Sequence, residues 1–178
     1  MAGPDKVLQD VGGRRLLDRV LDACAEASRV VVVGPETDVP RPVHWAREDP
    51  PGGGPVAAVR TGLAEVRGER VALLAGDLPF LRPADLRLLY ALAHPPASGA
   101  VLVDDAGREQ WLTSMWRVDA LTGALRSYSG DSLRGLLAPL RPRPLGVMSR
   151  EPRPWLDCDT PEQLDRARRL APDPARPG

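Results

Sequence analysis

The stretch "VALLAGDLPFL", residues 71–81, decides the fold. An apolar run without a charge ends at Gly76, and a single carboxylate, Asp77, follows at once. A short run that is apolar on both faces is typical of a strand covered by helices on both sides. Ligands of open α/β sheets bind outside the carboxyl ends of such strands. The stretch therefore predicts a buried strand with a functional position directly after it.

The segments on either side repeat this alternation of helix and strand. Residues 16–27 place apolar side chains three and four positions apart, which is the period of a helix. Residues 30–33 are consecutive valines ended by Gly34, which predicts a second buried strand. We therefore expect one α/β domain with a mostly parallel sheet and helices on both faces. The expected helices are 16–27, 56–66, 82–93, 118–128, 132–140 and 160–171, and the further strands are 99–105, 111–117 and an edge strand at 144–149.

Length and composition limit the class of protein. The chain has 178 residues, which suits a single domain; we expect it to span residues 1–172, with residues 173–178 as a disordered tail. Basic and acidic side chains balance at 24 each, so no basic surface indicates nucleic-acid binding. No apolar run is long enough for a membrane span or a signal segment. With two cysteines far apart in sequence, we expect a soluble protein of the reducing cytoplasm.

Acidic side chains stand at two candidate positions for a metal. Mg²⁺ prefers one or two carboxylates together with phosphate oxygens, and Asp77 at a strand end supplies such a ligand. The alternative is that Asp77 caps its turn or the helix that begins near Pro83. Asp157 and Asp159 share one face of an extended segment just before a helix, and one of them could join Asp77 at the metal. The alternative here is that Asp159 or Thr160 only caps that helix.

The glycines before the second helix form another candidate site. Residues 52–54 followed by Pro55 give a flexible backbone ahead of a helix N-terminus, a place for an anion or the edge of a ring. A plain loop is the alternative. The sequence offers no convincing Ser/His or Cys/His pair, so we expect chemistry that depends on positioning and on neutralising charge, not on a protein nucleophile.

Taken in order, several segments resemble the nucleotidyltransferases of the molybdenum cofactor guanylyltransferase type. The resemblance runs from Asp5 to about Arg169. It implies a three-layer α/β/α, Rossmann-like nucleotidyltransferase fold, a Mg²⁺ cofactor, and transfer of a nucleoside monophosphate from an NTP to a phosphate with release of pyrophosphate. The segments are "GPDK" (3–6), "GGRRLLDRVL" (12–21), "VVVVG" (30–34), "REDPPGGGPVAAVRTGL" (47–63), "ALLAGDLPFL" (72–81), "GREQWLTSMWR" (107–117) and "WLDCDTPEQLDRA" (155–167).

The resemblance also implies roles for single residues. Asp77 and Asp159 match the positions of metal ligands, and Lys6 matches a catalytic lysine that neutralises the triphosphate. The implied substrates are an NTP, with GTP expected, and a phosphorylated pterin-type acceptor such as molybdopterin; the implied protein partners are molybdenum cofactor enzymes or chaperones. The positions expected to approach the nucleoside or the pterin are Asp49, Gly53, Gly54, Pro55 and Gln110, although Trp111 stands after Gln110 where relatives have proline.

The beginning of the sequence departs from the family pattern. Relatives start with a buried strand and a loop of the form Leu-Ala-Gly-Gly-x-Ser-x-Arg-Met-Gly, whereas only "MAGPDK" precedes Val7 here. We therefore expect the first central strand, and most of the loop that holds the NTP phosphates, to be missing. Two alternatives stay open: a related nucleotidyltransferase with another NTP or acceptor, for instance a cytidylyltransferase, or a non-catalytic binding homologue without the phosphate loop.

Overall fold

The computed structural model describes residues 4–147 and 150–171. The last two residues of the edge strand expected at 144–149 and the tail expected at 173–178 lie outside these ranges. In the described part of the chain, no helix is both long and apolar enough to cross a membrane.

The larger sheet is made of strands whose order is β5-β7-β6-β8. Strand β5 (Arg70–Leu74) and strand β6 (Gly99–Val103) both run antiparallel to β7 (Glu109–Arg117), which lies between them. Strand β8 (Arg143–Gly146) pairs in parallel with β6 at the edge. Three of the strands therefore point in one direction, and β7 alone in this sheet runs against them.

A second, smaller sheet pairs β3 (Val31–Val33) in parallel with β4 (His44–Ala46). Among the described residues, β3 pairs only with β4, and β5 pairs only with β7, so each has one unpaired edge. All three valines of β3 are partly exposed, whereas residues 100–102 of β6 are fully buried. Within the described ranges, the two sheets are therefore not joined by hydrogen-bonded strands.

One face of the large sheet is covered by helices that pack on β7. Trp116 of β7 is fully buried in a cluster formed mainly by leucine and valine side chains of these helices. The helices are α2 (Gly54–Ala64), α4 (Val118–Ser127) and α5 (Leu133–Leu137), which continues into the short η2 (Ala138–Leu140).

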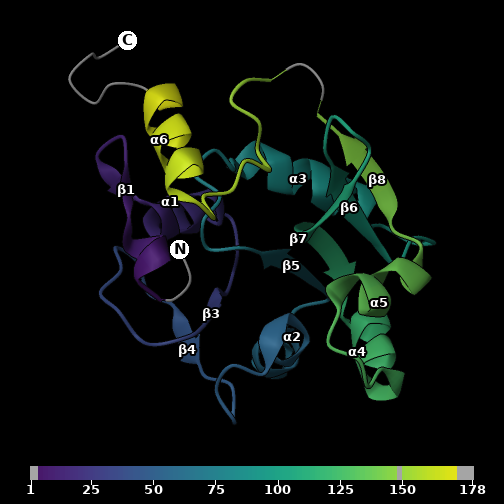
Figure 1. The fold of residues 1–178 in the computed structure, drawn as a ribbon. Coiled ribbons are helices and arrows are strands. Elements are labelled where there is room, and N and C mark those ends of the chain that lie inside the picture. Colours follow the sequence, from purple (N-terminus) through teal and green to yellow (C-terminus); the bar gives the residue numbers. More distant parts are fainter. Residues whose placement is uncertain (1–3, 148–149, 172–178) are drawn as a thin grey trace.

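The neighbouring residue of β7 points to the opposite face, as alternation along a strand requires. Met115 packs against Leu89 and Ala93 at the end of α3 (Pro83–Leu92). Beside it, α1 (Leu16–Ala23) packs against the turn after β5. Helices thus cover both faces, and the expected three-layer α/β/α architecture is confirmed (Figure 1).

The first described residues lie beside the last helix, α6 (Pro161–Leu170), as Figure 1 shows. A short helix, η1 (Pro4–Leu8), leads into a hairpin of β1 (Asp10–Val11) and β2 (Arg14–Arg15). Val11 of the hairpin is completely buried in one cluster with residues of α6.

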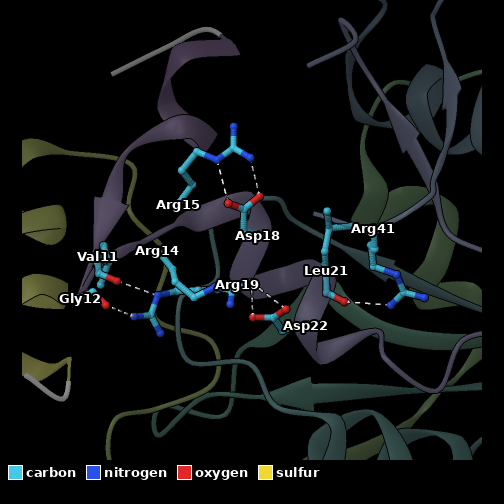
Figure 2. Close-up of polar contacts among 9 residues, drawn as sticks. All are labelled: Val11, Gly12, Arg14, Arg15, Asp18, Arg19, Leu21, Asp22 and Arg41. Carbon is cyan, nitrogen blue, oxygen red and sulfur yellow. Dashed lines mark hydrogen bonds and ion pairs between the residues drawn. The ribbon is translucent and has the colours of Figure 1, made fainter. Parts of the chain in front are cut away.

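Arginine side chains fix the hairpin to α1 (Figure 2). Arg19 donates from Nε to the carbonyl oxygen of Val11 at 2.7 Å and from Nη2 to that of Gly12 at 3.2 Å. Arg15 holds Asp18 within the first turn of the helix, at 2.8 and 2.9 Å. These bonds define where the chain enters α1, and so they limit the positions open to η1, which carries Lys6.

Candidate functional site

Asp77 lies in the turn directly after β5, at the carboxyl end of the strand. Its side chain is only 8% exposed, and Leu78 and Phe80 of the same turn are buried as well. Gly76 allows η1 to approach this turn: a Cβ at Gly76 would lie 3.0 Å from Cγ1 of Val7. The close contact brings the residue before Val7, which is Lys6, to the carboxylate of Asp77.

Asp159 belongs to the extended segment that precedes α6. Cys158 points into the core and is completely buried, so Asp157 and Asp159 both lie on its other side, as the spacing of two predicts. Thr160 caps α6 by accepting a hydrogen bond from the backbone N–H of Gln163 at 3.2 Å. The helix cap is therefore provided by Thr160, and Asp159 has a different contact.

Lys6 joins the two carboxylates. Its Nζ forms ion pairs with Oδ2 of Asp77 and with Oδ1 of Asp159. The lysine side chain is 15% exposed and that of Asp159 is 61% exposed. The cluster of Lys6, Asp77 and Asp159 is therefore shielded from solvent at Asp77 and open to solvent at Asp159. The structure thus brings together the three residues predicted to be catalytic or metal-binding. They come from η1, from the turn after β5 and from the segment before α6.

The electrostatics of this cluster show an excess of negative charge. Burial disfavours the charged form of Lys6, but hydrogen bonds to Asp159 and Asp77 outweigh it and raise the pKa of the ammonium group. The hydrogen bond from Lys6 lowers the pKa of Asp159. Burial, followed by the charges of Asp159 and Asp77, raises the pKa of Asp157. Within the described cluster, the ammonium group of Lys6 stands beside three carboxyl groups, so further positive charge would be favourable there.

The donor set fits a hard divalent cation. Two carboxylates that touch the same ammonium nitrogen also lie close enough to share one cation, and Mg²⁺ commonly takes one or two protein carboxylates and fills its other positions with water and phosphate oxygens. The described residues contain no group of three or more His, Cys, Asp or Glu side chains arranged as a complete metal cage. A cation held by Asp77 and Asp159 would keep its other positions open to water or phosphate oxygens.

The other predicted site residues lie on two different elements. Asp49 is in the loop after β4, Gly53 is the N-cap of α2, and Gly54 and Pro55 begin that helix. Gly54 has a φ of +82°, a conformation that favours glycine. Glu48, which the sequence patterns did not reveal, accepts a hydrogen bond from the backbone N–H of Gly52 at 3.1 Å and so helps to shape this loop.

Gln110 lies near the start of β7, at the edge of the sheet where β5 and β6 end. Its Nε2 donates to Oδ2 of Asp104 at 3.2 Å, and Asp104 also accepts hydrogen bonds from the backbone N–H groups of Ala106 and Arg108. The backbone N–H of Arg108 contributes most to the lowered pKa of Asp104, and the Arg108 side chain and the backbone N–H of Ala106 lower it further. In the structure Gln110 thus helps to hold the loop between β6 and β7, and its predicted contact with substrate stays a prediction.

A buried ion pair beside the site could not be seen in the sequence. Asp85, 2% exposed, accepts hydrogen bonds from Arg150 and from the backbone N–H of Arg82, where it caps α3. The capping role considered for Asp77 therefore belongs to Asp85. The only sequence signal was an acidic residue in the first turn of a helix, which is common and does not identify its distant partner.

Comparison with protein families explains why these parts occur together. Residues 1–145 match the model of the MobA-like NTP transferase domain. The chain belongs to this family. The MobA-like NTP transferases are nucleotidyltransferases, so the chain is an enzyme of that class. A curated relative, the molybdenum cofactor guanylyltransferase of Rhodopseudomonas palustris (strain HaA2), is 32% identical in an alignment that covers 96% of this chain and 86% of the relative.

Solved structures show the same fold. A molybdopterin-guanine dinucleotide biosynthesis protein A from Archaeoglobus fulgidus superposes with a TM-score of 0.74 at 17% identity, covering 94% of this chain and 91% of that one. A Mycobacterium tuberculosis H37Rv protein, solved as a complex with manganese, gives a TM-score of 0.70 at 23% identity and covers 94% of both chains. The Rossmann-like nucleotidyltransferase fold expected from the sequence is confirmed.

Proposed function

We propose that this MobA-like NTP transferase is a Mg²⁺-dependent guanylyltransferase, which transfers GMP from GTP to the phosphate of a molybdopterin-type acceptor and releases pyrophosphate. The observation that carries the proposal is that Lys6 joins Asp77 and Asp159, three charged groups at the carboxyl end of β5. This is the edge where α/β sheets bind ligands. The name of the curated relative from Rhodopseudomonas palustris supports guanylyl transfer and the molybdenum cofactor as its context.

The residues of the cluster suit a reaction between phosphates. Asp77 and Asp159 would hold Mg²⁺, which supplies neutralising charge to phosphate oxygens. Lys6 adds a second positive charge to the same place, and its raised pKa keeps it protonated at neutral pH. The phosphate of the acceptor would attack the α-phosphorus of GTP, the bond to the β-phosphate oxygen would break, and pyrophosphate would leave. The manganese found with the related Mycobacterium tuberculosis fold supports a divalent cation here.

Nucleoside and acceptor would lie along the same edge of the sheet. The loop from Asp49 to Pro55 ends at the N-terminus of α2, where backbone N–H groups favour an anion or a polar ring edge. Gln110 stands at this edge on β7. We assign these residues to substrate binding. Delivery of the product to molybdenum cofactor enzymes or chaperones in the cytoplasm is part of the same proposal.

The proposal is tested by the release of pyrophosphate from each of the four NTPs, with purified protein, molybdopterin and Mg²⁺. We expect release with GTP that needs molybdopterin and stops when EDTA is added. Equal release with CTP would contradict the proposed nucleotide. Release that continues in EDTA would contradict the proposed metal. No release with any NTP would favour a non-catalytic binding protein.

A further inference from the structure

A second contact network connects the two segments that carry Asp77 and Asp159. Arg150 lies in the segment between β8 and α6, on the way to Asp159. Its Nη2 donates to the carbonyl oxygen of Phe80 at 2.7 Å, in the turn that carries Asp77. Its Nη1 donates to both carboxylate oxygens of Asp85, at 2.9 and 2.8 Å. A single guanidinium group therefore holds the end of the Asp77 turn and the start of α3.

This ion pair is buried and has a fixed geometry. The side chain of Arg150 is 17% exposed and that of Asp85 only 3%. The same Asp85 also accepts the backbone N–H of Arg82 at 2.9 Å. Because the planar guanidinium and the carboxylate each satisfy several bonds at once, neither can shift without leaving a buried charge unpaired. The turn from Asp77 to Arg82 is thus held at its far end.

The segment that carries Arg150 is held in turn on its other side. Arg153 donates from Nη1 to the carbonyl oxygen of Arg150 at 3.2 Å and pairs with Asp105 at 3.1 Å. Further along, Cys158 is buried in the same apolar cluster as Phe80. The two carboxylate-bearing segments therefore touch twice, once through the guanidinium of Arg150 and once through the packing of Phe80 with the cluster around Cys158.

We propose that Arg150 is a positioning residue for the metal site: through Phe80 and Asp85 it sets the position of Asp77 relative to Asp159. This inference rests on the proposed function, because it assumes that the two carboxylates bind one divalent cation. Metal affinity depends on the groups that orient the ligands, and removing such a group typically costs 10–100-fold in affinity. Arg150 does not touch the metal ligands and acts only through the backbone that carries them.

The test is the binding of Mn²⁺, followed by electron paramagnetic resonance of the free ion, together with the melting temperature of each variant. Removing Arg150 alone leaves the charge of Asp85 buried, so the decisive variant is Arg150→Gln with Asp85→Asn, which removes both charges. We expect this double variant to melt within a few degrees of the parent and to bind Mn²⁺ about tenfold more weakly or worse. Asp85→Asn alone keeps the bond from Arg150 to Phe80 but removes the partner charge of the guanidinium, and we expect it to weaken Mn²⁺ binding less than the double variant does.

Two further variants separate the possible failures. Arg87→Gln together with Glu26→Gln removes both charges of an exposed ion pair and should leave Mn²⁺ binding unchanged, which controls for the loss of an ion pair as such. Asp77→Asn should abolish Mn²⁺ binding. If Asp77→Asn abolishes it and the Arg150/Asp85 double variant still binds like the parent, only the role of Arg150 is wrong. If Asp77→Asn also binds like the parent, the proposed metal site fails, and the positioning role fails with it.

Discussion

Asp77 and Asp159 contact the same ammonium nitrogen, although Asp77 follows β5 and Asp159 precedes the last helix. The fold brings them together in two steps. The hairpin after η1 packs against α6, and Gly76 lets η1 approach the turn of Asp77. The charge of Lys6 is therefore placed between two carboxylates that the sequence separates widely, at the edge of the sheet where this class of fold binds its ligands.

The first prediction concerns Asp77. Asp77→Asn keeps the size of the side chain and can still accept a hydrogen bond from Lys6, but it removes the charge. We expect turnover with GTP and Mg²⁺ to fall by about 100-fold or more, because charge stabilisation of the transferred phosphoryl group is lost. Steady-state kinetics and a thermal melt check this. Asp165→Asn, which breaks an exposed ion pair with Arg168 on α6, is the matched control and should change neither.

The second prediction concerns the pH dependence of stability that Lys6 confers. The raised pKa of Lys6 means that its contribution is complete below the ordinary value near 10.4 and is lost as the pH rises through the raised value. The lowered pKa of Asp159 means that its contribution is present above about 3.9 and is lost as the pH falls through the lowered value. The parent should therefore exceed Lys6→Gln in stability most between about pH 4 and pH 10.

Urea unfolding of the parent and of Lys6→Gln across this range measures the difference. The two curves should converge in acid and again in strong alkali. A gap of constant size at every pH would mean that the lysine stabilises the protein by packing alone.

The third prediction concerns the unpaired edges of β3 and β5. An added strand that pairs with both edges would cover the partly exposed valines of β3 and satisfy backbone groups on both strands. We expect a designed extension of roughly 15 residues ahead of η1, with an apolar strand of about five residues and a glycine-rich loop, to raise the melting temperature. It should also increase stabilisation by GTP with Mg²⁺, since ligand binding to the folded state raises stability.

The control for the designed extension carries proline at alternate strand positions, because proline cannot donate to a sheet. That version should melt like the parent. An equal rise with both extensions would show that the added strand does not pair with the edges.

The fourth prediction concerns the two cysteines. Burial raises the pKa of Cys24 to about 11 and that of Cys158 to about 12. Both thiols are free and buried, so at about pH 8 neither is accessible as a thiolate. A chromogenic disulfide reagent should react slowly with the native protein and fast with both thiols in guanidinium chloride. Fast reaction of the native protein would contradict the burial of the two thiols.

Much of the fold could be predicted because its strands and helices have strong periodicity. The valines of β3 and the stretch from Val71 to Ala75 predicted strands correctly, and Thr160 with Pro161 predicted the start of α6. The direction of β7 could not be predicted, since a buried run does not show which way a strand points. The hairpin of β1 and β2 was missed because each strand is only two residues long.

The site could be predicted only in part. Asp77 stood out as a carboxylate at a strand end, the spacing of Asp157 and Asp159 made one of them a second candidate, and the resemblance selected Asp159 and added Lys6. The ion pair of Arg150 with Asp85 could not be predicted, because it joins residues far apart in sequence without a repeating pattern, and its function depends on a turn that only the folded chain creates. The support that Glu48 gives to the glycine loop was missed for the same kind of reason.

The most direct measurement is the identification of the product by chromatography and mass spectrometry, after incubation of the protein with molybdopterin, Mg²⁺ and either GTP or CTP. We expect molybdopterin to become joined to GMP through a diphosphate, CTP to give little product, and Asp77→Asn to give about a hundredth of the parent's product or less. A cytidine product in place of the guanine product, or an undiminished guanine product from Asp77→Asn, would contradict the account of guanylyl transfer at the site of Lys6, Asp77 and Asp159.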